Sequence, residues 1–120
     1  MHTFHYRIIV SHQYHDMTRE LIDDFKKLRF KFTCRNWKSS IDFINAASVI
    51  AESDIVSHHP DIHLTRYRDI EVVLHTHSAA GLTLYDFKLA RELDKIKIDF
   101  SPKFLKSNPH IEDNANNVRE

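Results

Sequence analysis

The chain has 120 residues, 42% of them hydrophobic and 28% charged, a balance that is typical of one globular domain and excludes a disordered chain. Its 17 lysines and arginines match 17 aspartates and glutamates, so net charge provides no general attraction to nucleic acid or to an anionic membrane. The single cysteine, Cys34, excludes an internal disulfide and is expected to be a buried, reduced thiol. With no signal-peptide core and no apolar run of membrane-spanning length, we expect a cytoplasmic protein.

The first third of the chain predicts a strand, a helix and a second strand. Residues 3–10 are rich in aromatic and β-branched side chains, which favour a strand. Residues 17–27 place their apolar side chains on one side of a helix. Residues 28–34 alternate between apolar and polar side chains, as a half-buried strand does.

Helical spacing replaces this alternation over residues 37–52. The apolar residues recur there at three- and four-residue steps, which predicts a helix with Trp37 and Phe43 in the core. The sequence Ser39-Ser40-Ile41-Asp42 fits a capping box near its start. Pro60 prevents further helix in the loop that follows.

The next segment predicts a hairpin and a second helix. Residues 61–67 and 70–77 read as strands joined by a tight turn at Arg68-Asp69, with alternate residues of the second strand buried. Gly81, the only glycine, is expected to supply a backbone conformation that other residues resist. A helix is predicted from Thr83 to about residue 96.

The order of these elements predicts an α+β fold with helices on one face of an antiparallel sheet. We expect a single domain over residues 1–100 and a polar tail over residues 101–120, whose last dozen residues are mobile.

Histidines dominate the candidate chemistry. The chain has ten of them, and imidazole is the side chain whose ordinary pKa lies closest to neutrality. His58-His59-Pro60 stands in the loop before the predicted hairpin, and the hairpin brings His77 back toward it. Three imidazoles placed in this way predict a small acid–base pocket.

A metal site is the second interpretation of the same histidines. His75 and His77 alternate on one strand face, and His58, His59 or His63 could add a ligand. The chain has no cysteine pair and no His-Glu-x-x-His helix, so the acid–base interpretation is favoured.

Several polar residues have two interpretations. Thr83-Leu84-Tyr85-Asp86 is a capping-box pattern, so Asp86 can satisfy the helix N-terminus. Its carboxylate can instead orient a pocket histidine or bind substrate, and one residue can combine the structural and the functional role. Asp54 is either a solvated helix end or a pocket acid, and the sequence favours the solvated helix end. Tyr67 is expected to pack, not to bind a ligand.

The same residues resemble the signature of the pterin-4a-carbinolamine dehydratases. The resemblance runs from about residue 28 to residue 96 and rests on a set of motifs: Asp54, His58-His59-Pro60, Tyr67, His77, Gly81-Leu82-Thr83 and Asp86. It implies a four-stranded antiparallel sheet with helices on one face, in homodimers or homotetramers. It also implies a hydro-lyase that removes water from 4a-hydroxytetrahydrobiopterin to give the quinonoid dihydropterin, in tetrahydrobiopterin recycling, with no metal or redox cofactor.

By this analogy His58 and His77 transfer protons around the 4a-hydroxyl, and which of them is the acid stays open. His59 is expected to bind and orient the substrate, and Asp86 to hold a histidine. The implied pterin contacts are Asp54, Pro60 and Thr76.

The resemblance also implies an alternative function. Some members of the family act as binding modules that stabilise dimers of a transcription factor, so a non-catalytic dimerisation or assembly role on the same fold is the competing hypothesis, with a protein partner that the sequence does not identify. Three features depart from the family pattern: residues 1–27, Ser57 and Tyr85. The last two bear on substrate affinity more than on reaction type.

Overall fold

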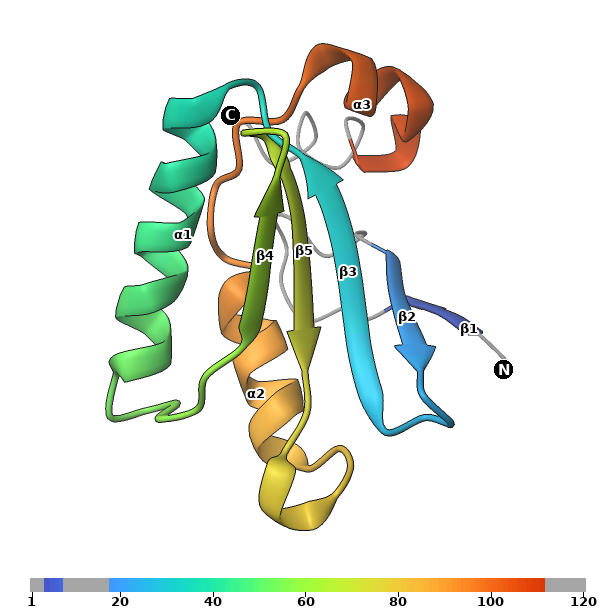
Figure 1. Cartoon of the computed structure of the whole chain (residues 1–120), viewed down its shortest axis with the longest axis vertical. Coiled ribbons are helices and arrows are strands. Elements are labelled where there is room, and N and C mark those ends of the chain that lie inside the picture. Colours follow the sequence, from blue (N-terminus) through green and yellow to red (C-terminus); the bar gives the residue numbers. More distant parts are fainter. Residues whose placement is uncertain (1–3, 8–17, 112–120) are drawn as a thin grey trace.

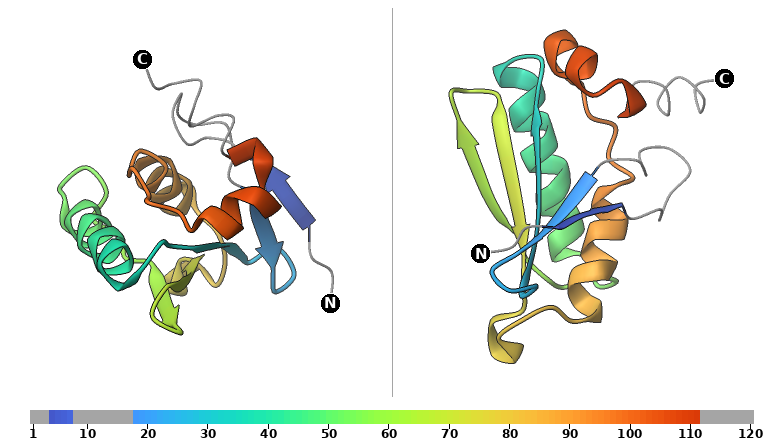
Figure 2. Two further views of the ribbon diagram at one scale, coloured as in Figure 1. Left: turned by 90° about the horizontal axis from the view of Figure 1, so that it is seen from above. Right: turned by 90° about the vertical axis from the view of Figure 1, so that its right-hand side faces the viewer.

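An antiparallel sheet of five strands, in the order β1-β2-β3-β5-β4, forms one layer of the protein (Figure 1). This computed structural model describes residues 4–7 and 18–111. In chain order the elements are β1 Phe4–Arg7, β2 Thr18–Ile22, β3 Lys27–Thr33, α1 Trp37–Glu52, β4 Asp61–Thr65, β5 Asp69–Leu74, the 3-10 helix η1 His77–Ala79, α2 Leu84–Leu93 and α3 Pro102–Ser107. Helices α1 and α2 lie side by side on one face of the sheet (Figure 2). The predicted α+β class is confirmed, and the sheet has one strand more than the family resemblance implied.

The core lies between the sheet and the helices. Alternate residues of the two central strands are buried: Leu28, Phe30, Phe32, Ile70, Val72 and Leu74. The register pairs Phe30 with Val72 and Phe32 with Ile70, so the two apolar rows adjoin. Burying each such side chain stabilises the fold by about 1.5–3 kcal/mol. The alternation predicted for residues 28–34 and 70–77 is confirmed, although β5 ends at Leu74.

Helix α1 has the predicted bounds, but its cap and its buried face differ from the prediction. Asn36 is the N-cap: its side chain accepts from the backbone N–H of Ser39 at 2.9 Å, and Ser39 Oγ accepts from the N–H of Asn36 at 2.9 Å. Phe43 is buried as predicted, whereas Trp37 is 58% exposed. At about 100° per residue Trp37 is roughly 120° around the helix from Phe43, so it misses the face that meets the sheet.

The helix predicted over residues 17–27 is wrong. Residues 18–22 form strand β2, which pairs with β1 and β3. A turn through Asp23, Asp24 and Phe25, all with positive φ, reverses the chain into β3. Three apolar residues in so short a segment fit either period, and pairing with two neighbouring strands decides between them. The strand predicted over residues 3–10 is confirmed for Phe4–Arg7, and residues 8–10 lie outside the described residues.

The β4–β5 turn comes earlier than predicted and changes the position of Tyr67. Strand β4 ends at Thr65, and Arg66 and Tyr67 adopt left-handed φ values of 47° and 58°. The side chain of Tyr67 is therefore 53% exposed instead of packed, with the guanidinium of Arg68 5.5 Å from its ring centroid.

The first part of the predicted polar tail packs on the core. Ser101 caps α3 with Pro102 at its first turn, Phe104 stacks on Phe100 at 5.5 Å, and Ile111 is buried. Apolar residues stand between the charged residues of this segment and pack on the core. For this reason the segment is not the polar tail that was predicted. The predicted mobility of the last dozen residues concerns mostly residues 112–120, which lie outside the described residues. None of the helices described is long and apolar enough to cross a membrane.

We expect Ile111→Ala to lower the free energy of unfolding by about 2–4 kcal/mol, because the change removes a buried side chain. Lys103→Ala, at an exposed position of α3, is the control and should stay within about 0.5 kcal/mol. Urea unfolding followed by tryptophan fluorescence measures both. If both variants changed the free energy of unfolding by the same small amount, the result would contradict the packing of this segment on the core.

Candidate active site

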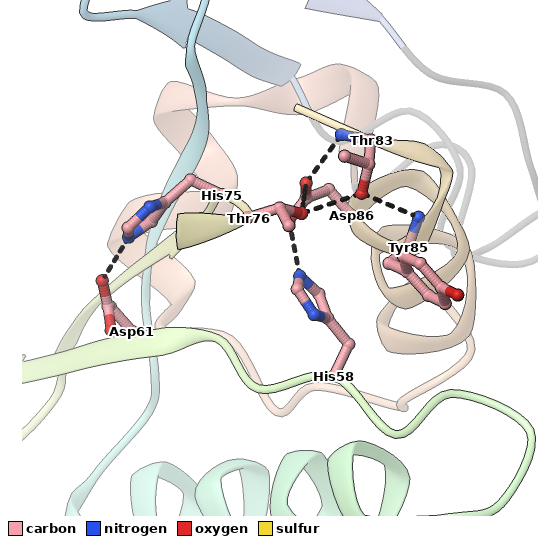
Figure 3. Close-up of polar contacts among 7 residues, drawn as sticks. All are labelled: His58, Asp61, His75, Thr76, Thr83, Tyr85 and Asp86. Carbon is pink, nitrogen blue, oxygen red and sulfur yellow. Dashed lines mark hydrogen bonds and ion pairs between the residues drawn. The ribbon is translucent and has the colours of Figure 1, made fainter. Parts of the chain in front are cut away.

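The carboxylate of Asp86 lies fully buried in the first turn of α2 (Figure 3). Its Oδ2 accepts hydrogen bonds from the backbone N–H of Thr83 at 2.9 Å and from the hydroxyl of Thr76 at 2.7 Å. Thr83 is the N-cap, and its Oγ1 accepts from the backbone N–H of Tyr85 at 3.3 Å. The capping box predicted at the start of this helix is confirmed.

The other oxygen of Asp86 holds His58. Nε2 of His58 lies 2.7 Å from Oδ1 of Asp86, and the His58 side chain is 17% exposed. Because a carboxylate only accepts hydrogen bonds, Nε2 carries the proton, and Nδ1 points away from Asp86 (Figure 3). Asp86 therefore caps α2 and also contacts a histidine, whereas its predicted alternative role in binding substrate stays a prediction.

Thr76 joins the end of β5 to this pair. Its hydroxyl has one hydrogen, which goes to Asp86, so in the 2.8 Å contact between the two threonine hydroxyls Thr83 is the donor. Three segments meet at one carboxylate: the loop before β4, the end of β5 and the start of α2. A buried carboxylate without donors is costly, so each segment depends on the position of the others.

The loop between Thr76 and Gly81 is closed by a two-residue bridge. The N–H of Thr76 donates to the carbonyl of Gly81 at 2.9 Å, and η1 occupies the span between them. The special backbone predicted at Gly81 belongs instead to Ala80, whose φ is 53°. A Cβ on Gly81 would meet Ala79 O at 3.9 Å and Lys26 Cγ at 4.0 Å, both ordinary contacts, so the prediction for Gly81 is wrong.

A second histidine group lies at the same end of the sheet. His77, exposed on η1, has its ring centroid 4.1 Å from that of His75, and His75 Nε2 lies 3.0 Å from Oδ2 of Asp61. A shallow depression of about 230 Å³ lies beside the two rings, with Lys26 and Lys27 among its lining residues. Only Thr76 separates His75 from His77 along the chain, so this group adjoins the Asp86–His58 pair.

The remaining predicted residues stand apart from Asp86. His59 is exposed and pairs with Glu52 at the end of α1. Asp54 is exposed in the turn after α1, which agrees with the solvated position that the sequence favoured. Pro60 is half-buried and ends the loop that carries His58. The structure thus joins His58, Thr76 and Asp86, and places His77 against His75.

Thr83 and Asp61 were not predicted to have a role in the site, and His75 was predicted only as a candidate metal ligand. The hairpin register offered a signal for one pair: Asp61 lies opposite Val73, so His75 is its diagonal neighbour on the same face. Beyond the helix cap, nothing in the sequence indicated that the hydroxyl of Thr83 would contact that of Thr76.

Neither a metal nor the thiol has geometric support as the reactive group. Among the residues that the structure describes, no three histidine, cysteine or acidic side chains are arranged to hold a metal ion. Burial raises the pKa of the Cys34 thiol, with the carboxylates of Asp99 and Asp69 acting in the same direction, which disfavours the nucleophilic thiolate.

Comparison with known families places the chain in one of them. Residues 15–96, more than half of the chain, match the family model described as pterin 4 alpha carbinolamine dehydratase. The chain belongs to this family. The matched segment contains both histidine groups and Asp86.

Individual relatives agree with the assignment. The chain is 31% identical over 77 residues to the mitochondrial pterin-4-alpha-carbinolamine dehydratase 2 of Arabidopsis thaliana, 64% of this chain and 40% of the relative. It is 38% identical over 66 residues to a protein assigned as the same dehydratase in Aquifex aeolicus, 55% of this chain and 64% of the relative. The chain thus spans less than two thirds of either relative. A crystal structure of a transcriptional coactivator/pterin dehydratase from Brucella melitensis superposes with a TM-score of 0.54 at 29% identity, covering 61% of this chain and 74% of that one.

We expect Asp86→Ala to lower the free energy of unfolding by about 3 kcal/mol, because it leaves the hydroxyl of Thr76 and the N–H of Thr83 without their acceptor. Asp54→Ala removes an exposed carboxylate and is the matched control, with an expected change of at most about 0.5 kcal/mol. Denaturant unfolding of both variants measures the difference. Similar values for the two would show that Asp86 does not hold these segments together.

Proposed function

We propose that this chain catalyses the dehydration of a 4a-hydroxytetrahydropterin, the pterin-4a-carbinolamine, to the quinonoid dihydropterin and water. The observation that carries the proposal is the buried Asp86–His58 pair, within a chain of the dehydratase family, with a second histidine group beside it. The names of the relatives point to the same substrate class.

The reaction needs two proton transfers and no change of oxidation state. The bond between C4a and the hydroxyl oxygen breaks, and the oxygen leaves with the electron pair as water after it receives a proton. Ring N5 loses its proton, and its electron pair forms the N5–C4a double bond. An imidazole can carry out either transfer near neutral pH, each worth on the order of 10²–10⁴ in rate.

We assign the two transfers to His58 and His77, with either order of acid and base. His58 turns Nδ1 away from Asp86, so that nitrogen is available to the substrate while Nε2 stays bonded to the carboxylate. Asp86 is then a positioning residue that fixes the tautomer and the ring orientation of His58. Thr76 gives its only hydroxyl proton to Asp86, which favours a positioning role over direct donation of that hydrogen to the pterin.

His59, Asp54 and Pro60 complete the proposed site from the loop between α1 and β4. His59 pairs with Glu52, but its side chain is exposed, so it is accessible to a substrate that covers this end of the sheet and could orient it. Asp54 is an exposed candidate for a pterin contact, and Pro60 restricts the backbone beside the two histidines.

We further propose that the enzyme needs no metal or redox cofactor, because the reaction balances with protons alone. A role in tetrahydrobiopterin recycling, a cytoplasmic location and a homodimer or homotetramer belong to the same proposal.

A second candidate function is a non-catalytic binding or dimerisation module. Leu84 and Tyr85, at the start of α2, are 85% and 60% exposed, which provides apolar surface beside the site. The Brucella melitensis neighbour is described as both coactivator and dehydratase. A scaffold would need Asp86 for its fold, but it would not need a histidine among the donors to that carboxylate or a second histidine group beside it, which is why we favour the enzyme.

Stopped-flow absorbance of 4a-hydroxytetrahydropterin decay tests the proposal, with the substrate generated in situ. We expect the wild-type protein to accelerate decay and His58→Ala to lower the catalysed rate by on the order of 10²–10⁴. His63→Ala, on the exposed face of β4, should retain the wild-type rate.

Sedimentation of the same variants separates the two candidate functions. If the chain is an enzyme, we expect the His58→Ala protein to keep the wild-type oligomer and to lose activity. No acceleration by the wild-type protein, with an intact oligomer, would refute the dehydratase proposal and favour the binding module.

A further inference from the structure

A row of three side chains, Asp61, His75 and His77, crosses the end of the sheet beside the Asp86–His58 pair. We propose that Asp61 and His75 act together as a positioning pair for His77, fixing the orientation of its ring. The catalytic part of this inference rests on the proposed function, whereas the coupling between the three side chains does not.

The contacts form a continuous path from the carboxylate to the second ring. Nε2 of His75 lies 3.0 Å from Oδ2 of Asp61, and the ring centroid of His75 lies 4.1 Å from that of His77, with the ring planes 69° apart. The side chain of His75 is 13% exposed and that of Asp61 is 53% exposed. His75 is therefore the partly buried link between an exposed acid and an exposed imidazole.

The backbone sets this row by strand register. Asp61 is the first residue of β4 and lies opposite Val73 of β5, so His75, two residues further along, is the diagonal neighbour on the same face. The chain then enters η1, which begins at His77. The bridge between Thr76 and Gly81 holds η1 close to the strand end.

The chemistry explains why His77 needs such support. Asp86 holds His58, whereas His77 lies exposed on a single turn of 3-10 helix. An exposed imidazole samples several rotamers, and fixing one geometry before reaction is a large part of what a catalytic site contributes. With Nε2–H of His75 donated to Asp61, the His75 ring is fixed and offers His77 an edge-to-face contact.

Other charged side chains also lie around the depression, but among the described residues Asp61 is the acid within ion-pair distance of His75. Asp23, Lys26 and Lys27 share the lining with both histidines, and Nζ of Lys27 lies 3.8 Å from Oδ2 of Asp23. Asp61 is the acid that the structure pairs with His75. The row thus has one carboxylate end and one imidazole end.

NMR of histidine-labelled protein tests the coupling without reference to activity. The ring signal of His77 is assigned by its loss in His77→Asn. We expect Asp61→Asn and His75→Gln each to move that signal, although Asp61 reaches His77 only through His75 in the described contacts. His63→Gln is the matched control, because His63 lies on the same face of β4 and outside the row. Shifts no larger than the control's would overturn the proposal.

Kinetics then tests whether the coupling matters for the reaction. We expect Asp61→Asn and His75→Phe to lower kcat about 10-fold with little change in KM, because a misplaced group costs up to about 100-fold in rate. His75→Phe keeps a ring against His77 and loses the bond to Asp61, so a fall in its kcat assigns the effect to that bond. Unfolding midpoints close to that of the wild type exclude general destabilisation.

The outcomes of the two experiments are separable. Shifts of the His77 signal together with an unchanged kcat would overturn the positioning role. An inactive wild-type protein would refute the proposed function, and the His77 signal alone would then decide whether the three side chains are coupled.

Discussion

The burial of one carboxylate constrains this end of the molecule. Asp86 has no exposed surface, and a buried carboxylate is stable only where donors reach it. The backbone of Thr83, the hydroxyl of Thr76 and the ring of His58 are those donors, and they come from three separate segments. The same carboxylate therefore caps α2 and orients His58. A change at Asp86 is expected to alter both the stability of the fold and the geometry of the site.

The sheet supplies the second constraint. Because β4 and β5 pair in a fixed register, Asp61 and His75 become diagonal neighbours and His77 follows them into η1. The Asp86–His58 and Asp61–His75 pairs then approach one end of the sheet from different elements (Figure 3). The proposed reaction needs two proton transfers, and this arrangement brings imidazoles from both groups to one end of the sheet.

Local pattern predicted the elements whose faces are clearly divided between core and solvent. Strand β3, helix α1 and the Thr83–Asp86 capping box follow from alternation, helical period and cap chemistry, and the family motifs singled out His58 and Asp86. Residues 18–22 were missed because strand pairing with distant segments overrides a weak helical period. Trp37 is exposed because it lies roughly 120° around α1 from Phe43, away from the face that meets the sheet. The left-handed backbone conformation occurs at Ala80 and not at Gly81 because the closure of the loop decides which residue adopts it.

The rate of 4a-hydroxytetrahydropterin decay with Asp86→Asn tests the central claim most directly. An asparagine oxygen can still accept from Thr83 and Thr76, so we expect the free energy of unfolding to fall by at most about 2 kcal/mol. Its amide would face Nε2 of His58 with a donor and force the opposite tautomer, so the catalysed rate should fall by on the order of 10² or more. A folded Asp86→Asn protein with the wild-type rate would contradict the account.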